Sequence, residues 1–212
     1  MEFAEVVRRR RMVRDYDPAR PVPPAVVDRV LAHAIRAPSA GFAQGWAFLV
    51  LAEPGQRAAF WTATTPPGAP ASPWLAGMRR APLIVVPMSS EKAYLDRYAE
   101  PDKGWTDRDP GRWPVPYWHV DAAFAALLIL LTAVDEGLGA CFFGIPPAGT
   151  APFRAAFGVP AEFAPVGAIT VGYAAPDRPS PSLRRGRRPV EQVVHHGRWR
   201  PGPATGEPVA GT

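Results

Sequence analysis

The apolar segment Ala122-Ala-Phe-Ala-Ala-Leu-Leu-Ile-Leu-Leu131 decides the fold of this chain. Asp121 before it is a favourable N-cap and Gly137 suits the C-terminal exit, so we predict a helix over Ala122–Glu136. A helix that is apolar on nearly every side must be enclosed by other elements or by a partner subunit. We therefore expect it to be the structural centre and a dimer contact. The apolar run is shorter than the roughly 18 residues that cross a bilayer, so no membrane span is predicted.

Short apolar runs before and after this helix predict strands. Trp46–Leu51 and Leu83–Val86 precede it, and Gly139–Ile145 and Val166–Tyr173 follow it. Apolar spacing and stop signals predict further helices in the rest of the chain. These are Glu2–Arg11, a segment from Pro24 to Pro38, Gln56–Thr62 and 150–157.

Clusters of the 28 prolines mark the irregular connections. Thr64–Pro73 is predicted to be a mobile loop, and residues 89–118 a second long irregular stretch. The tail 201–212 is predicted to be disordered. A length of 212 residues suits one domain, which we place at residues 1–200.

The charge and cysteine content place only broad limits on the function. The clustering of the basic residues is more informative. The 24 basic residues exceed the 19 acidic ones by five, and all but Lys92 and Lys103 are arginines. Guanidinium groups suit bidentate contact with phosphate, although a general preference for Arg over Lys explains most single positions. The single cysteine, Cys141, excludes an internal disulfide, and the N-terminus lacks a secretory apolar stretch. We expect a cytoplasmic protein.

Three segments could form an anion and cofactor site: RRRRMVR at 8–14, APSAGFAQGW at 37–46 and RRGRRP at 184–189. Each also has a purely structural interpretation. A run of Arg at a helix end is typical of a solvated face that favours the helix C-terminus electrostatically. The small-residue stretch is equally typical of a turn. Their combination is more specific than any one of them.

Four motifs in order resemble the nitroreductase family. The family's double Arg, small polar residue and further basic residue are matched by Arg10-Arg11-Met12-Val13-Arg14, and its alanine-proline-serine turn before a strand by residues 37–46. Its Gly-Leu-Gly leading into a short strand that ends in Gly is matched by residues 137–144, and its basic C-terminal stretch by RRGRRPVEQVV at 184–194. The resemblance spans residues 2 to about 199.

This resemblance implies an α+β fold, with a central mixed or antiparallel sheet flanked by helices and a long buried helix at a homodimer interface. It also implies bound FMN, reduced by NADH or NADPH, which then reduces a small organic acceptor such as a nitroaromatic or a quinone in a ping-pong reaction. No metal ion, nucleic acid or membrane is expected as a partner.

The resemblance assigns roles to individual residues. Arginines from both ends of the chain would surround the phosphate and the polar edge of FMN through charge-assisted hydrogen bonds. The backbone of Gly144, with Phe143, matches the family position near the reactive flavin N5 and is the expected catalytic contact. The expected cofactor-binding residues are Arg10, Arg11, Met12, Arg14, Ser39, Ala40, Gly41, Phe42, Gln44, Gly144, Arg185 and Arg187.

Three positions depart from the family pattern. Met12 stands where a small hydroxyl residue is usual, Phe42 where Asn is frequent, and Gly45 where Pro is usual. The first two remove hydrogen-bonding groups near the expected flavin and leave the substrate class open. The Gly-Phe-x-Gln form also occurs in the related enzyme that fragments reduced flavin to make the lower base of cobalamin. We do not find that enzyme's other features in this sequence, so it is a minor alternative.

Aromatic residues are expected on the substrate side. Trp74 and the stretch that contains Trp105, Trp113 and Trp118 form either a lid over the flavin or part of a dimer seam. A covered flavin favours flat, apolar acceptors. Cys141, in an apolar strand, is expected in the core rather than as a nucleophile. The expected substrate contacts are Trp74, Tyr117, His119 and Phe124.

Two other functions compete with an NAD(P)H-dependent reductase. One is a flavin-dependent dehydrogenase or oxidase of a biosynthetic pathway, which the substitutions at Met12 and Phe42 favour. The other is a basic nucleic-acid-binding protein that uses the Arg clusters on phosphates. The sequence contains no recognisable nucleic-acid-recognition module, which weighs against the second.

Overall fold

The computed structural model describes residues 1–66, 68–70, 72–176 and 180–199. It divides into two compact units, Met1–Asp177 and Arg178–Thr212, and each is described by itself. The predicted disordered tail at 201–212 lies outside the described residues. A single domain over residues 1–200 stays a prediction.

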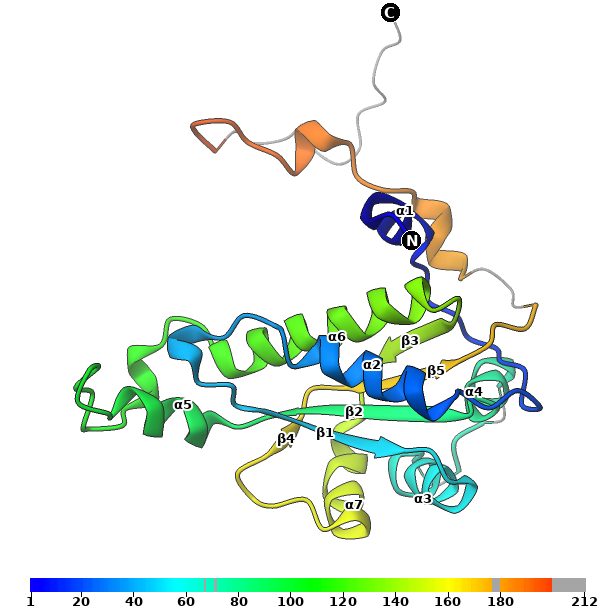
Figure 1. Cartoon of the computed structure of the whole chain (residues 1–212), viewed down its shortest axis with the longest axis horizontal. Coiled ribbons are helices and arrows are strands. Elements are labelled where there is room, and N and C mark those ends of the chain that lie inside the picture. The colour runs from blue at the N-terminus through cyan, green and yellow to red at the C-terminus, as the bar shows by residue number, and fades with distance from the viewer. Residues whose placement is uncertain (67, 71, 177–179, 200–212) are drawn as a thin grey trace, which may run out of the picture. The chain divides into compact units, whose positions relative to one another are not determined.

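The first unit is built on an antiparallel sheet (Figure 1). Strands β1 (Trp46–Leu51), β2 (Leu83–Ser89), β5 (Ala168–Gly172) and β3 (Gly139–Phe143) lie side by side in that order, and the short β4 (Ala164–Pro165) pairs with the end of β2. All pairings among these described strands are antiparallel. A sheet of this kind, flanked by helices, confirms the predicted α+β class.

Helices cover both faces of this sheet (Figure 1). On one face lie α2 (Pro24–Ala34) and α6 (Tyr117–Asp135). On the other lie α3 (Pro54–Thr64), α4 (Pro73–Arg79) and α7 (Pro147–Phe157). The sheet therefore separates two apolar cores.

Strand β2 shows why these segments could be located from the sequence. Leu83 and Val85 pack in the core under α2 and α6, while Ile84 and Val86 pack in the core under α3, α4 and α7. All four side chains are at most 1% exposed. A strand with both faces covered must be a continuous apolar run, and such a run stands out in the sequence.

The central helix differs from its prediction at its N-terminus. α6 begins at Tyr117 rather than Ala122, because Pro116 starts the first turn and its carbonyl accepts from the amide of His119 at 2.9 Å. Asp121 is therefore inside the helix, and its prediction as the N-cap is wrong. Among the described residues, α6 alone is long and apolar enough to pass a test for a membrane-spanning helix, and 50% of that stretch is buried inside the chain.

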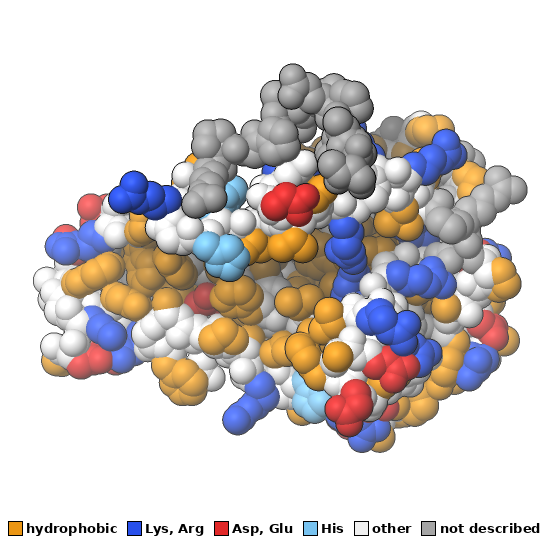
Figure 2. Space-filling view, turned by 90° about the horizontal axis from the view of Figure 1, so that it is seen from above, with side chains coloured by type: hydrophobic (Ala, Val, Ile, Leu, Met, Phe, Trp, Pro, Cys, Tyr) orange, Lys and Arg blue, Asp and Glu red, His pale blue; other side chains and the backbone are white. Residues whose placement is uncertain are grey.

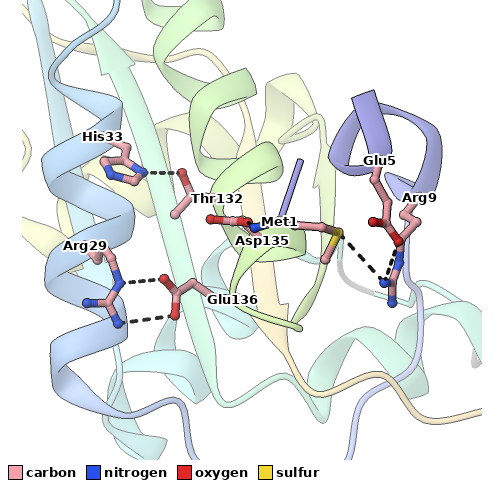
Figure 3. Close-up of polar contacts among 8 residues, drawn as sticks. All are labelled: Met1, Glu5, Arg9, Arg29, His33, Thr132, Asp135 and Glu136. Carbon is pink, nitrogen blue, oxygen red and sulfur yellow. Dashed lines mark hydrogen bonds and ion pairs between the residues drawn. The ribbon is translucent and has the colours of Figure 1, made fainter. Parts of the chain in front are cut away.

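The C-terminal end of α6 is bound to the helices beside it (Figure 3). The amino group of Met1 lies 2.5 Å from Oδ1 of Asp135, and Arg29 on α2 forms a two-point ion pair with Glu136. Carboxylates at a helix C-terminus are disfavoured by the helix dipole, and these cations offset that repulsion. Helix α1 (Phe3–Arg9) is shorter than the predicted Glu2–Arg11.

Two short helices, α4 and α5 (Glu91–Tyr98), were not predicted. Residues 89–118 hold α5 and a 3-10 turn (Pro110–Arg112), and Thr64–Pro73 leads directly into α4. Ser90 and Ser72 cap these helices by accepting from the amides of Ala93 and Leu75. Both helices are short and were missed because their apolar residues are too few to show a helical period.

The second unit has little regular structure within its described residues. It contains two 3-10 turns, Pro181–Arg185 and Val190–Gln192. Arg188 donates to the carbonyl of Gln192 at 3.0 Å, and the rings of His195 and Trp199 lie 4.1 Å apart. Arg185 and Arg187 belong to this unit and are exposed, so their expected contact with the cofactor stays a prediction.

Candidate active site

The basic N-terminal segment is held against strand β3. Met12 forms a parallel bridge with Ala140, whose carbonyl accepts from the amide of Val13 at 3.0 Å. Val13 fills the space beside Gly139, where an added Cβ would lie 2.6 Å from a Val13 methyl group. Residues 10–14 are thus fixed at the edge of the sheet, next to the C-terminal end of α6.

One guanidinium nitrogen of Arg10 is buried. Among the described residues, no hydrogen-bond partner lies near its Nη1, although that atom is shielded from solvent. A buried N–H of a charged group without an acceptor costs free energy, so native structures rarely leave one unpaired without a reason. The position is suited to a bound anion.

The other predicted residues of this segment, Arg11, Met12 and Arg14, each have a different environment. Arg11 lines a cleft of about 270 Å³ together with Arg9, Leu138 and Gly139. The side chain of Met12 packs against both apolar cores, where a hydroxyl would have no advantage. Arg14 donates to the carbonyl of Met12 at 3.3 Å.

Helix α4 lies against the backbone of this segment through a glycine. An added Cβ at Gly77 would lie 2.2 Å from the carbonyl oxygen of Arg14. Backbone atoms held by a sheet cannot move aside cheaply. Gly77 is therefore needed for helix α4 to pack where it does.

We predict that Gly77→Ala lowers the free energy of unfolding by about 1–3 kcal/mol, the usual cost of overpacking, as measured by urea denaturation. The matched control is Gly55→Ala in α3, where an added Cβ meets no atom within 4 Å. Gly55→Ala should be neutral or stabilise the protein by up to about 1 kcal/mol. Equal effects of the two substitutions would contradict this account of Gly77.

The turn at residues 39–45 has an unusual backbone. Gly41, Phe42 and Gln44 all have positive φ, at 60°, 56° and 48°. For a residue with a side chain, this conformation costs about 1–2 kcal/mol. The hydroxyl of Ser39 supports the turn by accepting from the amide of Gln44 at 3.1 Å. The turn projects the aromatic ring of Phe42, which is 73% exposed.

Two residues that the sequence did not single out for the site contact this turn. Asp121 accepts from the amide of Ala40 at 2.8 Å, and Arg97 donates to the carbonyl of Gly41 at 2.8 Å. Neither lies near the turn in sequence. A favourable N-cap position was the signal for Asp121, and it pointed to the wrong role.

An apolar cavity of about 200 Å³ lies beside Gly144. The ring of Phe143 stacks on Trp61 with centroids 5.6 Å apart, and Trp74 meets Phe143 edge-on at 5.9 Å. Among the described residues, the buried indole Nε1 of Trp61 has no hydrogen-bond partner. The structure thus brings the predicted catalytic pair, Phe143 and Gly144, together with one predicted substrate residue, Trp74.

The other predicted substrate residues lie on the N-terminal half of α6. Tyr117 and Phe124 are 36% and 43% exposed. His119 is also on the surface, and its Nδ1 lies 2.8 Å from the hydroxyl of the buried Ser89. These three do not line the cavity beside Gly144.

Partial burial lowers the pKa of His119 below its usual 6.5. The folded protein therefore resists protonation of His119 more than the unfolded chain does, and stability is lost as the pH falls below about 6.5. We predict that His119→Gln reduces the loss of unfolding free energy between pH 7.5 and pH 5.5. Urea denaturation of both proteins at the two pH values measures this, and an unchanged difference would contradict it.

The tryptophans of the 99–118 stretch pack on one another and on α5. Trp113 is at the centre of the cluster. Its ring neighbours are Tyr94, Tyr98, Trp105, Tyr117 and Trp118, at centroid distances of 4.5 to 6.4 Å. The cluster explains why so many aromatic residues follow one another here, and the predicted lid over a flavin stays a prediction.

The two groups of expected cofactor residues lie at opposite ends of α6 (Figure 1). The turn is bonded to Asp121, near the start of the helix, and residues 12–13 pair with Ala140, just beyond its end. From Asp121 to Asp135 a helix rises about 21 Å at 1.5 Å per residue. Within one chain, Arg10 and the turn are therefore not neighbours.

The comparisons with known proteins place the chain in a family. The model of the nitroreductase family matches residues 7–173. Because that match covers well over half of the chain, the protein belongs to the nitroreductase family.

Solved structures share the fold. A protein of Exiguobacterium sibiricum, named as a nitroreductase in complex with FMN, is 19% identical with a TM-score of 0.73, over 94% of this chain and 98% of that one. A protein of Parabacteroides distasonis, named as an NADH dehydrogenase/NAD(P)H nitroreductase, is 20% identical with a TM-score of 0.68, over 94% and 99%. One of Clostridium acetobutylicum, named as an NADH oxidase, is 23% identical with a TM-score of 0.62, over 92% and 99%.

Proposed function

We propose that this protein is an FMN-dependent oxidoreductase that takes reducing equivalents from NADH or NADPH and passes them to a small organic acceptor. The observation that carries the proposal is the buried Nη1 of Arg10, which has no partner in the part of the chain that the structure describes, in a member of the nitroreductase family. FMN, when bound, would accept hydride from the nicotinamide and deliver it to the acceptor in a second half-reaction. The protein itself would bind and orient FMN and the two substrates.

Arg10 and Arg14 would hold the phosphate of FMN. A phosphate monoester supplies the acceptor oxygens that Nη1 of Arg10 lacks among the described residues, and charge-assisted hydrogen bonds of this kind are roughly twice as strong as neutral ones. Arg185 and Arg187 are proposed to complete the phosphate site. The anchoring of residues 12–13 on β3 keeps the cationic segment in place before the anion arrives.

We further propose that the working form is a homodimer whose cofactor sites are shared between subunits. Arg10 and the turn at 39–45 lie at opposite ends of α6, so both can contact one FMN if each comes from a different copy. The helix between them carries an apolar stripe that the first unit leaves partly uncovered: Val120, Phe124, Leu127, Leu131 and Val134. These residues repeat every three or four positions, which is the spacing of a helix face that packs on another helix.

The surface agrees with a subunit contact on this side. Hydrophobic side chains gather on the face that α2 and α6 form (Figure 2). Leu127 is 45% exposed. An apolar face of this kind is typical of an association surface.

The cavity beside Gly144 is suited to a flat, apolar acceptor. Trp61, Trp74 and Phe143 present aromatic surfaces that favour stacked rings and exclude water. The proposed acceptors are nitroaromatics and quinones.

The first test is the visible spectrum of the purified protein, with the released cofactor identified by chromatography. We expect flavin absorbance, release of FMN, and oxidation of NADH or NADPH when menadione or a nitroarene is added. A colourless protein that does not bind added FMN would overturn the proposal. Bound FMN without reduction by either nucleotide would instead favour the oxidase or dehydrogenase alternative.

A further inference from the structure

The turn at residues 39–45 is anchored at its start by a buried carboxylate. Oδ2 of Asp121 accepts from the amide of Ala40 at 2.8 Å and from the hydroxyl of Tyr94 at 2.7 Å. Asp121 is 3% exposed and Tyr94 is fully buried. Because both donors converge on one buried oxygen, Ala40 cannot move without breaking a satisfied polar network.

A guanidinium group anchors the middle of the turn. Nε of Arg97 donates to the carbonyl of Gly41 at 2.8 Å, and its two terminal nitrogens bind the two carboxylate oxygens of Asp102 at 2.7 Å each. Only the planar fork of an arginine can make all three bonds from one side chain. Arg97 therefore ties the turn to the loop that follows α5.

Two further contacts complete the fit. The carbonyl of Gly45 accepts from the amide of Ser90 at 2.7 Å. Tyr98 lies so close to Gly41 that an added Cβ would be 2.6 Å from its ring. The turn is thus contacted from α5, from the residue before α5 and from α6.

Strained backbone persists only where its surroundings over-determine it, and it tends to mark functional positions. Here the surroundings force Phe42 and Gln44 into positive φ while Phe42 stays exposed to solvent. Since Phe42 gains little packing within the chain, folding alone does not explain the conformation.

We propose that Asp121 and Arg97 are positioning residues of the cofactor site: they hold the turn in its left-handed conformation before FMN binds. This inference rests on the proposed function, because it takes the turn to contact FMN held by a second copy. A turn that is already ordered loses less conformational entropy on binding than a flexible one, so the clamp raises affinity without touching the cofactor.

The test compares four variants of the full-length protein. Asp121→Ala and Arg97→Gln each remove one anchor. Asp121→Asn keeps an acceptor oxygen in place and is the conservative rescue. The control, Arg108→Gln, removes an ion pair between exposed side chains, with Asp96, that does not touch the turn.

Two measurements are made on the wild type and on each variant. Hydrogen exchange of the FMN-free protein reports how often the turn opens, and titration with FMN gives the dissociation constant. In Asp121→Ala and Arg97→Gln, we expect the amides of residues 40–45 to exchange at least about tenfold faster, and the dissociation constant to rise about tenfold. Asp121→Asn should lie between Asp121→Ala and the wild type, and Arg108→Gln should match the wild type.

The outcomes separate this inference from the proposed function. If the wild type binds FMN and both anchor variants bind it equally well, the positioning role is wrong while the proposed function stands. Unchanged exchange in both variants would likewise overturn it. If the wild type does not bind FMN, the proposed function fails and the inference fails with it. Should Asp121→Ala not fold, Arg97→Gln decides, because Arg97 is a partly exposed side chain outside the core.

Discussion

Replacing Arg10 by methionine is expected to weaken FMN binding by roughly 10- to 150-fold, the range that hydrogen bonds to charged groups span. Methionine keeps the apolar stem and removes the guanidinium group whose Nη1 has no partner among the described residues. Titration of the FMN-free protein with FMN measures the loss directly.

The same substitution should not destabilise the protein without its cofactor. A buried N–H of a charged group that lacks an acceptor opposes folding, so removal of Nη1 of Arg10 is expected to leave the unfolding free energy unchanged or higher. The matched control is Arg8→Gln, because Arg8 is exposed and lies beside Glu5 on α1. An Arg10 variant that binds FMN as well as the Arg8 variant does would contradict the proposed phosphate contact.

Replacing Leu127 by arginine is expected to convert the proposed dimer into monomers and to abolish FMN binding together with it. A dimer that uses this face would then bury two unpaired charges, one from each subunit, at a cost of several kcal/mol per ion. Analytical ultracentrifugation gives the oligomeric state, and titration with FMN gives the binding.

The control for Leu127→Arg is Ala155→Arg, on an exposed position of α7 across the sheet. It adds the same charge to the opposite face and should leave both the dimer and FMN binding intact. A Leu127→Arg monomer that still binds FMN at wild-type affinity would show that one chain supplies the whole site. A persistent dimer would place the subunit contact elsewhere.

The positions of the strands and of the central helix followed from local patterns. The segments 46–51 and 83–86 are apolar because helices cover both faces of the sheet, and α6 is apolar on most sides because sheet, α2 and the proposed partner surround it. Burial on all sides leaves a continuous hydrophobic signal in the chain. The order of the motifs was likewise visible, and it led to the correct family.

The boundaries of the elements and the roles of the polar side chains could not be predicted from local sequence patterns. Asp121 was expected to cap α6 and instead bonds Ala40 and Tyr94, 81 and 27 residues away in sequence. The aromatic stretch was expected to be irregular and to form a lid or part of a dimer seam, and within the chain it packs around Trp113 and against a short helix. Such contacts depend on distant segments meeting, which no local pattern encodes.

By itself, the sequence determined which segments are buried and which family they build, because burial imposes a regular spacing on apolar residues. Only the tertiary structure decided that Arg10 has a buried nitrogen with no partner among the described residues, that the turn has positive φ angles and is contacted by α5 and α6, and that these two features lie at opposite ends of one helix. Each of these depends on a single hydrogen bond or on a distance across the fold. Such properties arise from contacts between segments that are distant in sequence, and these contacts produce no periodic pattern in the sequence.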